Sequence, residues 1–191
     1  MTEIKIRDAR VEDCPSLAHI IIRATQHTFR GLVPDKCLDW LTPEQSEVNW
    51  AKNFGLDGSP NPGFNLYVAE TDLKEVTGLA LIMKISSDDY YEPSVPKQYS
   101  QELRSLQVDP VWHRQGIGRL LVEHIAKKLK QRNTAHMLVR VLKENPNRAF
   151  YEHLGAVPLG SRPYNWEGYL TEEIVYGWQN LNELIKEERS S

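Results

Sequence analysis

The stretch LRSLQVDPVWHRQGIGR, residues 103–119, decides the fold of this chain. It begins as a strand, turns after an Asp-Pro pair, and opens a helix with Gly116 and Gly118. The first N–H groups of a helix have no partner within the helix and lie at its positive end, so they form an anion site. Arg114 and Arg119 flank the turn and add formal charge. The stretch therefore predicts a site for a phosphate or pyrophosphate.

Two other phosphate motifs fit this stretch poorly. A Walker loop needs Gly-Lys-Ser or Gly-Lys-Thr, which the chain lacks. A dinucleotide-binding fingerprint, as in a nicotinamide-dependent oxidoreductase, needs a third glycine at position 121, which is Leu121. A tight turn with surface arginines and no ligand stays open as the plain structural alternative.

The elements on either side of this stretch predict a parallel crossover. Apolar residues at helical spacing predict a helix from Gly116 to about Lys130, with Leu120 among its inward positions. Strands are expected over Glu102–Val108 before it and Ala135–Leu142 after it. A strand, a helix and a strand in this order give two parallel neighbours in one sheet.

Farther out, the pattern predicts antiparallel strands at both ends of that sheet. A first strand at Ile4–Arg7 precedes a helix that Asp13 caps and that ends near Phe29. The other expected elements are a helix over Pro43–Phe54 with Val48 and Ala51 inward, a hairpin of Asn65–Thr71 and Val76–Ile85, a helix from Asn145 to Leu154, strands at Val157–Ser161 and Leu170–Trp178, and a short charged helix within 180–191. The result is one α/β (α+β) domain over residues 1–191 with a mixed central sheet and helices on its faces.

Composition narrows the class of protein. The chain has 191 residues with 23 Lys and Arg against 26 Asp and Glu, a net charge of −3 and a pI near 6.1. A mildly acidic chain disfavours nucleic acid as a partner. No apolar run is long enough for a membrane span, and the first residues show no signal peptide. Two cysteines, Cys14 and Cys37, are typical of free thiols in a reducing cytoplasm. No cluster of His, Cys or acidic residues has metal-site spacing.

Two motifs resemble one enzyme family. The segment Val108–Leu121, VDPVWHRQGIGRLL, resembles the pyrophosphate loop of the GNAT (Gcn5-related) N-acetyltransferases, whose pattern is Gln/Arg-x-x-Gly-x-Gly/Ala. The segment 145–156, NPNRAFYEHLGA, resembles the second family signature, Asn…Phe-Tyr-Glu-x-Leu-Gly-Phe. The expected order of elements matches the family over nearly the whole chain. The resemblance implies a GNAT-like acyl-CoA N-acyltransferase fold, with a splayed pair of parallel strands.

The resemblance also implies acetyl-CoA as co-substrate, with no metal. By analogy, the strand end would hold the pantetheine arm, the loop would hold the pyrophosphate, and an asparagine would contact the cofactor arm. The position three before the first glycine is His113 here, where the family pattern has Gln or Arg, and a neutral imidazole offers a single N–H donor. These expected cofactor contacts are Leu106, Gln107, Val108, His113, Arg114, Gln115, Gly116, Ile117, Gly118, Arg119, Asn145, Asn147 and Tyr151.

Catalytic roles follow from the same resemblance. Tyr151 matches the family tyrosine that donates a proton to the departing CoA thiolate, with a tyrosine packed in the core as the alternative. Glu102, expected on the same strand face as Leu106 and Val108, is the candidate base, with a surface glutamate as the alternative. Tyr99 and Glu92 are weaker candidates for the base. The backbone N–H of Val108 is the expected oxyanion donor.

The acceptor is expected to be a primary amine on a small molecule, peptide or protein. The first helices, the segment 86–101 and the final hairpin carry the aromatic residues expected to shape its site: Trp40, Trp50, Tyr90, Tyr91, Tyr164, Trp166 and Tyr169. Asp88, Asp89 and Glu92 would suit a cationic amine. A non-catalytic acyl-CoA sensor on the same fold is the competing function. Homodimers are common in the family, although no residue here marks a subunit interface.

Overall fold

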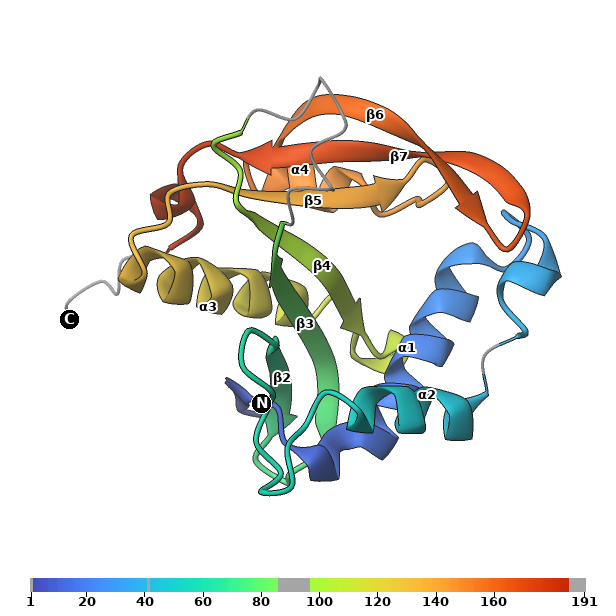
Figure 1. Cartoon of the computed structure of the whole chain (residues 1–191), viewed down its shortest axis with the longest axis vertical. Helices are drawn as coiled ribbons and strands as arrows, with labels where there is room; N and C mark the ends of the chain where they lie inside the picture. The colour runs from blue at the N-terminus through green and yellow to red at the C-terminus, as the bar shows by residue number, and fades with distance from the viewer. Residues whose placement is uncertain (1, 41, 86–96, 186–191) are drawn as a thin grey trace.

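The computed structural model describes residues 2–40, 42–85 and 97–185. They form a seven-stranded mixed sheet with the strand order β1-β2-β3-β4-β5-β7-β6 (Figure 1). Every neighbouring pair is antiparallel except β4 and β5, which are parallel. The strands are β1 (Ile4–Asp8), β2 (Asn65–Thr71), β3 (Val76–Lys84), β4 (Gln101–Val108), β5 (Met137–Leu142), β6 (Val157–Trp166) and β7 (Tyr169–Trp178). The predicted mixed sheet, its parallel crossover and its antiparallel ends are confirmed.

Helices cover both faces of the sheet. The α-helices are α1 (Cys14–Phe29), α2 (Pro43–Ala51), α3 (Ile117–Gln131) and α4 (Ala149–His153); the 3₁₀ helices are η1 (Val11–Asp13), η2 (Asp35–Cys37), η4 (Pro110–Trp112) and η5 (Leu181–Leu184). On one face, Leu17 and Ile20 of α1 pack with Val68 of β2 and Leu79 of β3. On the other face, α3 and α4 share one core with residues of β2 to β5 and β7. No helix in the described part of the chain is long and apolar enough to cross a membrane.

The parallel pair β4–β5 opens into a fork. The two strands are paired only at Glu102↔Leu138 and Leu103↔Val139, and they then diverge (Figure 1). From Arg104 onward β4 is paired on one side only, with β3, while β5 remains paired with β7. The expected splayed pair is therefore present, and its vertex lies at Leu103 and Val139.

A β-bulge in the β3–β4 pairing changes which side chains of β4 share a face. The register shifts between Leu81 and Ile82 of β3, opposite Ser105 and Leu103 of β4. As a result Leu103 and Leu106 contact the same core, although strict alternation would place them on opposite faces. The expectation that Glu102 shares a face with Leu106 and Val108 is therefore wrong.

Several element details also differ from the sequence-based expectations. In α2, Val48 is 53 % exposed, so it does not point inward, and the helix ends at Ala51. Leu120 of α3 is 40 % exposed. Asp13 precedes α1 but does not cap it, because its carboxylate accepts hydrogen bonds from Arg7 and from the backbone N–H of Arg10. Both strands of the final hairpin are longer than expected.

The C-terminal expectation is met in part. Residues 181–184 form η5, which buries Leu181 and Leu184 against the α3 core. Both cysteines are free and buried. Tyr90, Tyr91, Asp88, Asp89 and Glu92 lie outside the described residues.

Candidate active site

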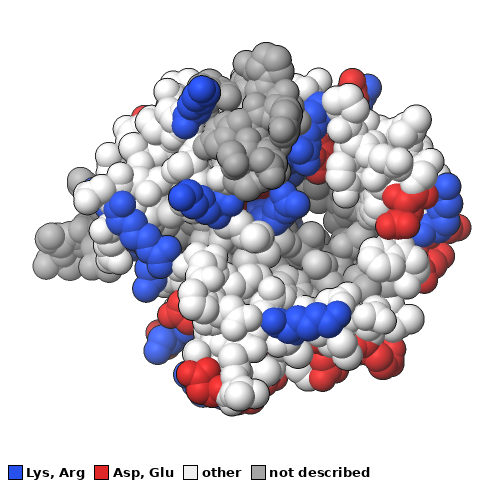
Figure 2. Space-filling model, viewed as in Figure 1, with Lys and Arg blue, Asp and Glu red and all other residues white. Residues whose placement is uncertain are grey.

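A cavity of about 640 Å³ occupies the fork between β4 and β5 and continues to α1 and β6. Figure 2 shows the corresponding hollow on the viewed face, with Lys and Arg side chains beside it. Every predicted cofactor residue except Gln115 lines this cavity, which contains Leu106, Gln107, Val108, His113, Arg114, Gly116, Ile117, Gly118, Arg119, Asn145, Asn147 and Tyr151. Residues from two distant sequence motifs therefore meet in one place.

The β4 wall of the cavity presents backbone polar groups. The N–H of Asp109 donates to the carbonyl of Thr77 in β3, at 2.9 Å. Successive residues of a strand turn their N–H and C=O groups to opposite sides. Those of Val108 and Leu106 therefore point away from β3, into the fork where no strand pairs with them. The carbonyl of Val108 accepts from His113, and the N–H of Val108 and both groups of Leu106 face the fork. An extended ligand that carries amide groups can satisfy them, as a further strand would.

The start of α3 forms the opposite end of the cavity. Gly116 has φ +82° at the N-cap, a conformation that non-glycine residues adopt only at a cost, and a Cβ there would meet no atom within 4 Å. At Gly118 the backbone is ordinary, but a Cβ would lie 3.3 Å from Cζ of Phe150. The first glycine thus provides the turn, and the second allows close packing. The first N–H groups of α3, which have no helical partner, remain available for an anion.

Histidine 113 fastens the loop to the end of β4. Its Nε2 lies 2.9 Å from the carbonyl oxygen of Val108, so this nitrogen carries the proton and donates it. The ring also makes an edge contact with His27 of α1, at 5.4 Å between ring centroids. The N–H that an imidazole offers is therefore used within the protein. Positive charge at this end comes from Arg114 and Arg119, and Nε of Arg119 is buried with no hydrogen-bond partner among the described residues.

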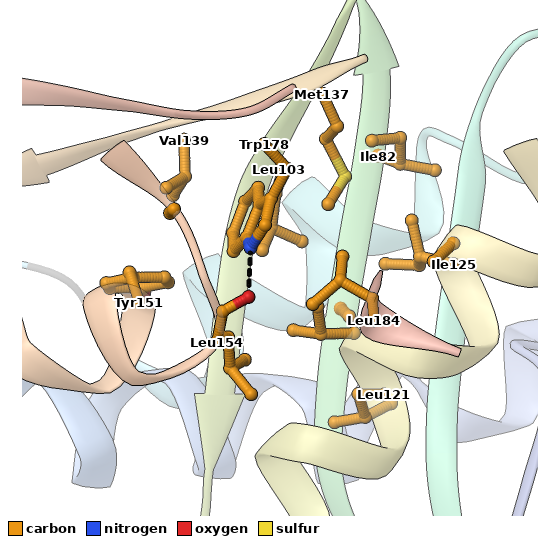
Figure 3. Packing of buried hydrophobic residues seen from close by; sticks show 14 of the residues in the cluster. Ile82, Leu103, Leu121, Ile125, Met137, Val139, Tyr151, Leu154, Trp178 and Leu184 are labelled. Atoms are coloured by element: carbon orange, nitrogen blue, oxygen red, sulfur yellow. Dashed lines mark hydrogen bonds between the residues drawn. The ribbon is translucent and has the colours of Figure 1, made fainter. Parts of the chain in front are cut away.

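Tyrosine 151 lies where the core meets the cavity. It comes from α4, and its ring packs beside Tyr176 and Trp178. Figure 3 shows Tyr151 and Trp178 in the same core. Trp178 is itself held by a hydrogen bond from its Nε1–H to the carbonyl of Leu154, at 2.9 Å. The ring of Tyr151 is therefore fixed, and its side chain also lines the cavity. Burial raises the pKa of Tyr151 to about 12, so its phenol stays protonated at neutral pH.

Asn145 and Asn147 occupy the turn that leads into α4. The side-chain oxygen of Asn145 accepts a hydrogen bond from the backbone N–H of Asn147, at 2.8 Å. Asn145 therefore closes a turn and does not cap the helix, which begins at Ala149. Both asparagines also line the cavity.

Glu102 is not among the cavity-lining residues. It is buried, at 4 % exposure, and its carboxylate pairs with Arg140 at 2.6 Å and with Arg104 at 3.2 Å. This position gives the candidate base no direct path to an acceptor amine. The weaker candidate Tyr99 is also buried, in a separate cluster with Leu138 and Val175.

Sequence analysis missed part of the cavity wall. Glu173 of β7 lines it, as does Arg140 of β5. The signal for Arg140 was present, since it is the one charged residue in the otherwise apolar strand MLVRVL. Tyr164 and Trp166, expected at the acceptor end, do line the cavity, and residues 24, 25, 28 and 29 of α1 close it. By contrast, Trp50 packs into the core under α1, and Trp40 is exposed.

Comparison with known proteins identifies the fold and the domain. Residues 62–155 match the family model described as the acetyltransferase (GNAT) domain. The uncharacterized N-acetyltransferase YuaI of Bacillus subtilis is 25 % identical over 181 residues, which cover 95 % of this chain and 96 % of that protein.

Two solved structures share the fold at lower identity. The PaiA N-acetyltransferase of Thermoplasma acidophilum, solved in complex with coenzyme A, is 15 % identical, with a TM-score of 0.66 over 93 % of this chain and 99 % of that one. The ribosomal-protein-S18-alanine N-acetyltransferase of Escherichia coli is 21 % identical, with a TM-score of 0.62 over 99 % of both chains.

Proposed function

Because the chain carries a GNAT acetyltransferase domain and is thus an acetyl-CoA-dependent acyltransferase, we propose that it transfers the acetyl group directly from acetyl-CoA to a primary amine. The observation that carries the proposal is the shared cavity. One cavity contains the open edge of β4, the start of α3 and the phenol of Tyr151. Direct transfer requires the thioester and the amine to meet in a single site, without a covalent enzyme intermediate.

The cavity residues fit acetyl-CoA. Residues 114–119 would hold the pyrophosphate through backbone N–H groups, and the empty space beside Gly116 leaves room for it. The backbone N–H and C=O groups of Leu106, which no strand pairs with, would hold the amides of pantetheine, with Gln107 beside them. Asn145 and Asn147 would contact the arm from the other side of the cavity. The N–H of Val108 is the proposed donor to the oxyanion.

Tyr151 is proposed to assist departure of the CoA thiolate. The amine nitrogen forms a bond to the carbonyl carbon, and the carbon–sulfur bond then breaks with its electron pair on sulfur. With a pKa of about 12, the phenol is a weaker acid than an alkyl thiol, whose pKa is about 8.5. Tyr151 therefore stabilises the thiolate mainly as a hydrogen-bond donor. The proton that the attached nitrogen loses as the amide forms goes to the thiolate and gives the CoA thiol.

Glu173 is proposed to receive a different proton, the one that the acceptor ammonium loses before it attacks. An alkyl ammonium has a pKa near ~10.4 and must lose a proton before it attacks. Among the described residues, Glu173 is the only carboxylate that lines the cavity. Its Oε2 accepts a hydrogen bond from Nε of Arg162 at 2.6 Å. We assign Glu102 instead to holding Arg140 in place.

The test is a screen of primary amines with purified protein and acetyl-CoA, read out as released CoA thiol and confirmed by mass spectrometry of the acetylated amine. We expect turnover with at least one class of amine. Tight binding of acetyl-CoA without transfer to any amine, peptide or protein would instead support a sensor. Residence in the cytoplasm, a single domain over residues 1–191, homodimers and the absence of nucleic-acid or membrane partners stay predictions from the sequence.

A further inference from the structure

The guanidinium of Arg140 is buried at the cavity, and two of its nitrogen atoms have no hydrogen-bond partner among the described residues. Its side chain is only 2 % exposed, and the residue lines the cavity next to the vertex of the fork. Its Nη1 donates to Glu102 at 2.6 Å. Its Nε and Nη2 are buried and have no hydrogen-bond partner among the described residues. Buried polar groups without partners are rare in native proteins, so this arrangement calls for an explanation.

The two unsatisfied nitrogens form one recognition edge. The N–H groups of Nε and Nη2 point in parallel from the same side of the guanidinium, which matches the two oxygens of a carboxylate. Glu102 does not serve this edge, because its carboxylate accepts from Nη1 of Arg140, and Nε and Nη2 are left without a partner among the described residues. Both nitrogens are buried, and the cavity that Arg140 lines is the route by which a ligand would approach them.

A negative charge faces the same part of the cavity. In the β5–β7 ladder, Arg140 lies opposite Val175, and Leu142 lies opposite Glu173. Opposed residues share a sheet face, so Arg140 and Glu173 are diagonal neighbours on one face. Such neighbours are about 7–8 Å apart between Cα atoms, within reach of long side chains. A guanidinium and a carboxylate thus stand side by side in the acceptor region.

A purely structural ion pair does not account for this pattern. Burying a charge pair is costly, and the cost is offset only when the remaining donors are also hydrogen-bonded. Here Glu102 satisfies one nitrogen of Arg140 and leaves the two-nitrogen edge open. The aromatic side chains of Tyr164 and Trp166, which line the same cavity, add an apolar wall beside the charges.

We propose that the acceptor is a free amino acid, whose carboxylate binds the Nε and Nη2 edge of Arg140 while its ammonium group faces Glu173. This inference rests on the proposed acetyl transfer to an amine and narrows its substrate class. A residue at the N-terminus of a protein lacks the free carboxylate next to its amine, so it would be a poor acceptor.

The first experiment compares matched acceptors. Each protein amino acid is tested against its own amide and its decarboxylated amine, with CoA thiol release as the readout. A charged hydrogen bond contributes about 1.5–3 kcal/mol, so kcat/KM for the acid should exceed that for the amide by about 10- to 100-fold. Equal rates for acid and amide would overturn the inference and leave the proposed function standing. Transfer to no amine would overturn both.

The second experiment changes the guanidinium. Arg140→Gln should raise KM for amino acids by about 10- to 100-fold, leave KM for the amides unchanged, and keep acetyl-CoA binding. The double variant Arg140→Gln/Glu102→Gln removes the buried carboxylate that the single change leaves with Arg104 alone, and it should show the same selective loss. Arg132→Gln, on the exposed end of α3, is the matched control. A folded variant that retains the acid preference would contradict the inference.

Discussion

At the scale of single residues, Tyr151 is the side chain whose replacement tests the chemistry best. Tyr151→Phe removes the phenol hydroxyl group and keeps the ring that packs beside Trp178. Loss of one hydrogen-bond donor to a developing anion costs about 10²–10³-fold, so kcat should fall by that factor. Steady-state kinetics measures the loss in kcat, and calorimetric titration measures the binding of acetyl-CoA. The dissociation constant of acetyl-CoA should stay the same. Unchanged kcat would make Tyr151 a core residue only.

The raised pKa of Tyr151 predicts how stability depends on alkaline pH. Below pH 10 the phenol is protonated in both the folded and the unfolded state, and its contribution is complete. Between pH 10 and about 12 the unfolded chain ionises while the folded protein keeps the proton. The free energy of unfolding should therefore fall by up to about 3 kcal/mol over this window.

Urea unfolding of wild type and Tyr151→Phe at a series of pH values checks this prediction. Other tyrosines with raised pKa values lower the stability of both proteins equally, so the difference isolates Tyr151. We expect the variant to lose less stability above pH 10. Parallel pH profiles would contradict the assigned burial.

Some site residues could be placed from the sequence alone, and others could not. The glycine turn and Tyr151 could be placed from motifs, because local backbone and helix spacing determine where they lie. The position of Glu102 could not, because a bulge of β4 against β3 ends the two-residue alternation, and that bulge arises from long-range pairing. Arg140 and Glu173 become neighbours only through the β5–β7 ladder, which no local pattern reveals.

At the scale of elements, the turn from β4 into α3 gives a paired test. Gly116→Ala forces a left-handed conformation on a residue with a Cβ, at about 1–2 kcal/mol, and should weaken acetyl-CoA binding. Gly118→Ala keeps an ordinary backbone but presses on Phe150, so it should also weaken binding. Gly63→Ala, with φ +86° and open surroundings away from the cavity, is the control.

Denaturant unfolding and calorimetry distinguish the three glycine variants. Both Gly116→Ala and Gly63→Ala should lose stability, and only the former should lose affinity for acetyl-CoA. Equal dissociation constants of acetyl-CoA for all three variants would contradict the prediction, because they would show that the ligand needs neither Gly116 nor Gly118.

Most elements could be predicted because their apolar periodicity is strong. The helix α3 and the β2–β3 hairpin lie within a few residues of the expected bounds. The prediction of which face of α2 points inward was wrong, because tertiary packing buries Ser46 and leaves Val48 exposed. The helix expected from Asn145 starts later, since the first four residues form an Asn-capped turn.

At the scale of the whole molecule, Arg7 joins three parts of the fold. From β1 it pairs with Asp13 at 2.8 Å, at the start of α1, and with Glu70 of β2 at 2.6 Å. The guanidinium of Arg7 lowers the pKa of Glu70, against the opposing effect of burial. Replacing Arg7 leaves two largely buried carboxylates without this partner.

Arg7→Leu should therefore lower the free energy of unfolding by about 3 kcal/mol, as measured in urea. Arg30→Leu is the control, because Arg30 pairs with Asp35 and Asp39 on the exposed surface, and its loss should change stability little. Equal effects of the two substitutions would show that the Arg7 network does not hold the N-terminal strand in place.

The central claim is that the fork between β4 and β5 and the start of α3 together hold acetyl-CoA. A crystal structure of the protein with acetyl-CoA tests it most directly. We predict the diphosphate on the backbone N–H groups of residues 114–119, the pantetheine arm along β4 between Leu106 and Val108, and the thioester beside Tyr151. A ligand bound elsewhere, with the fork filled by side chains, would contradict the account.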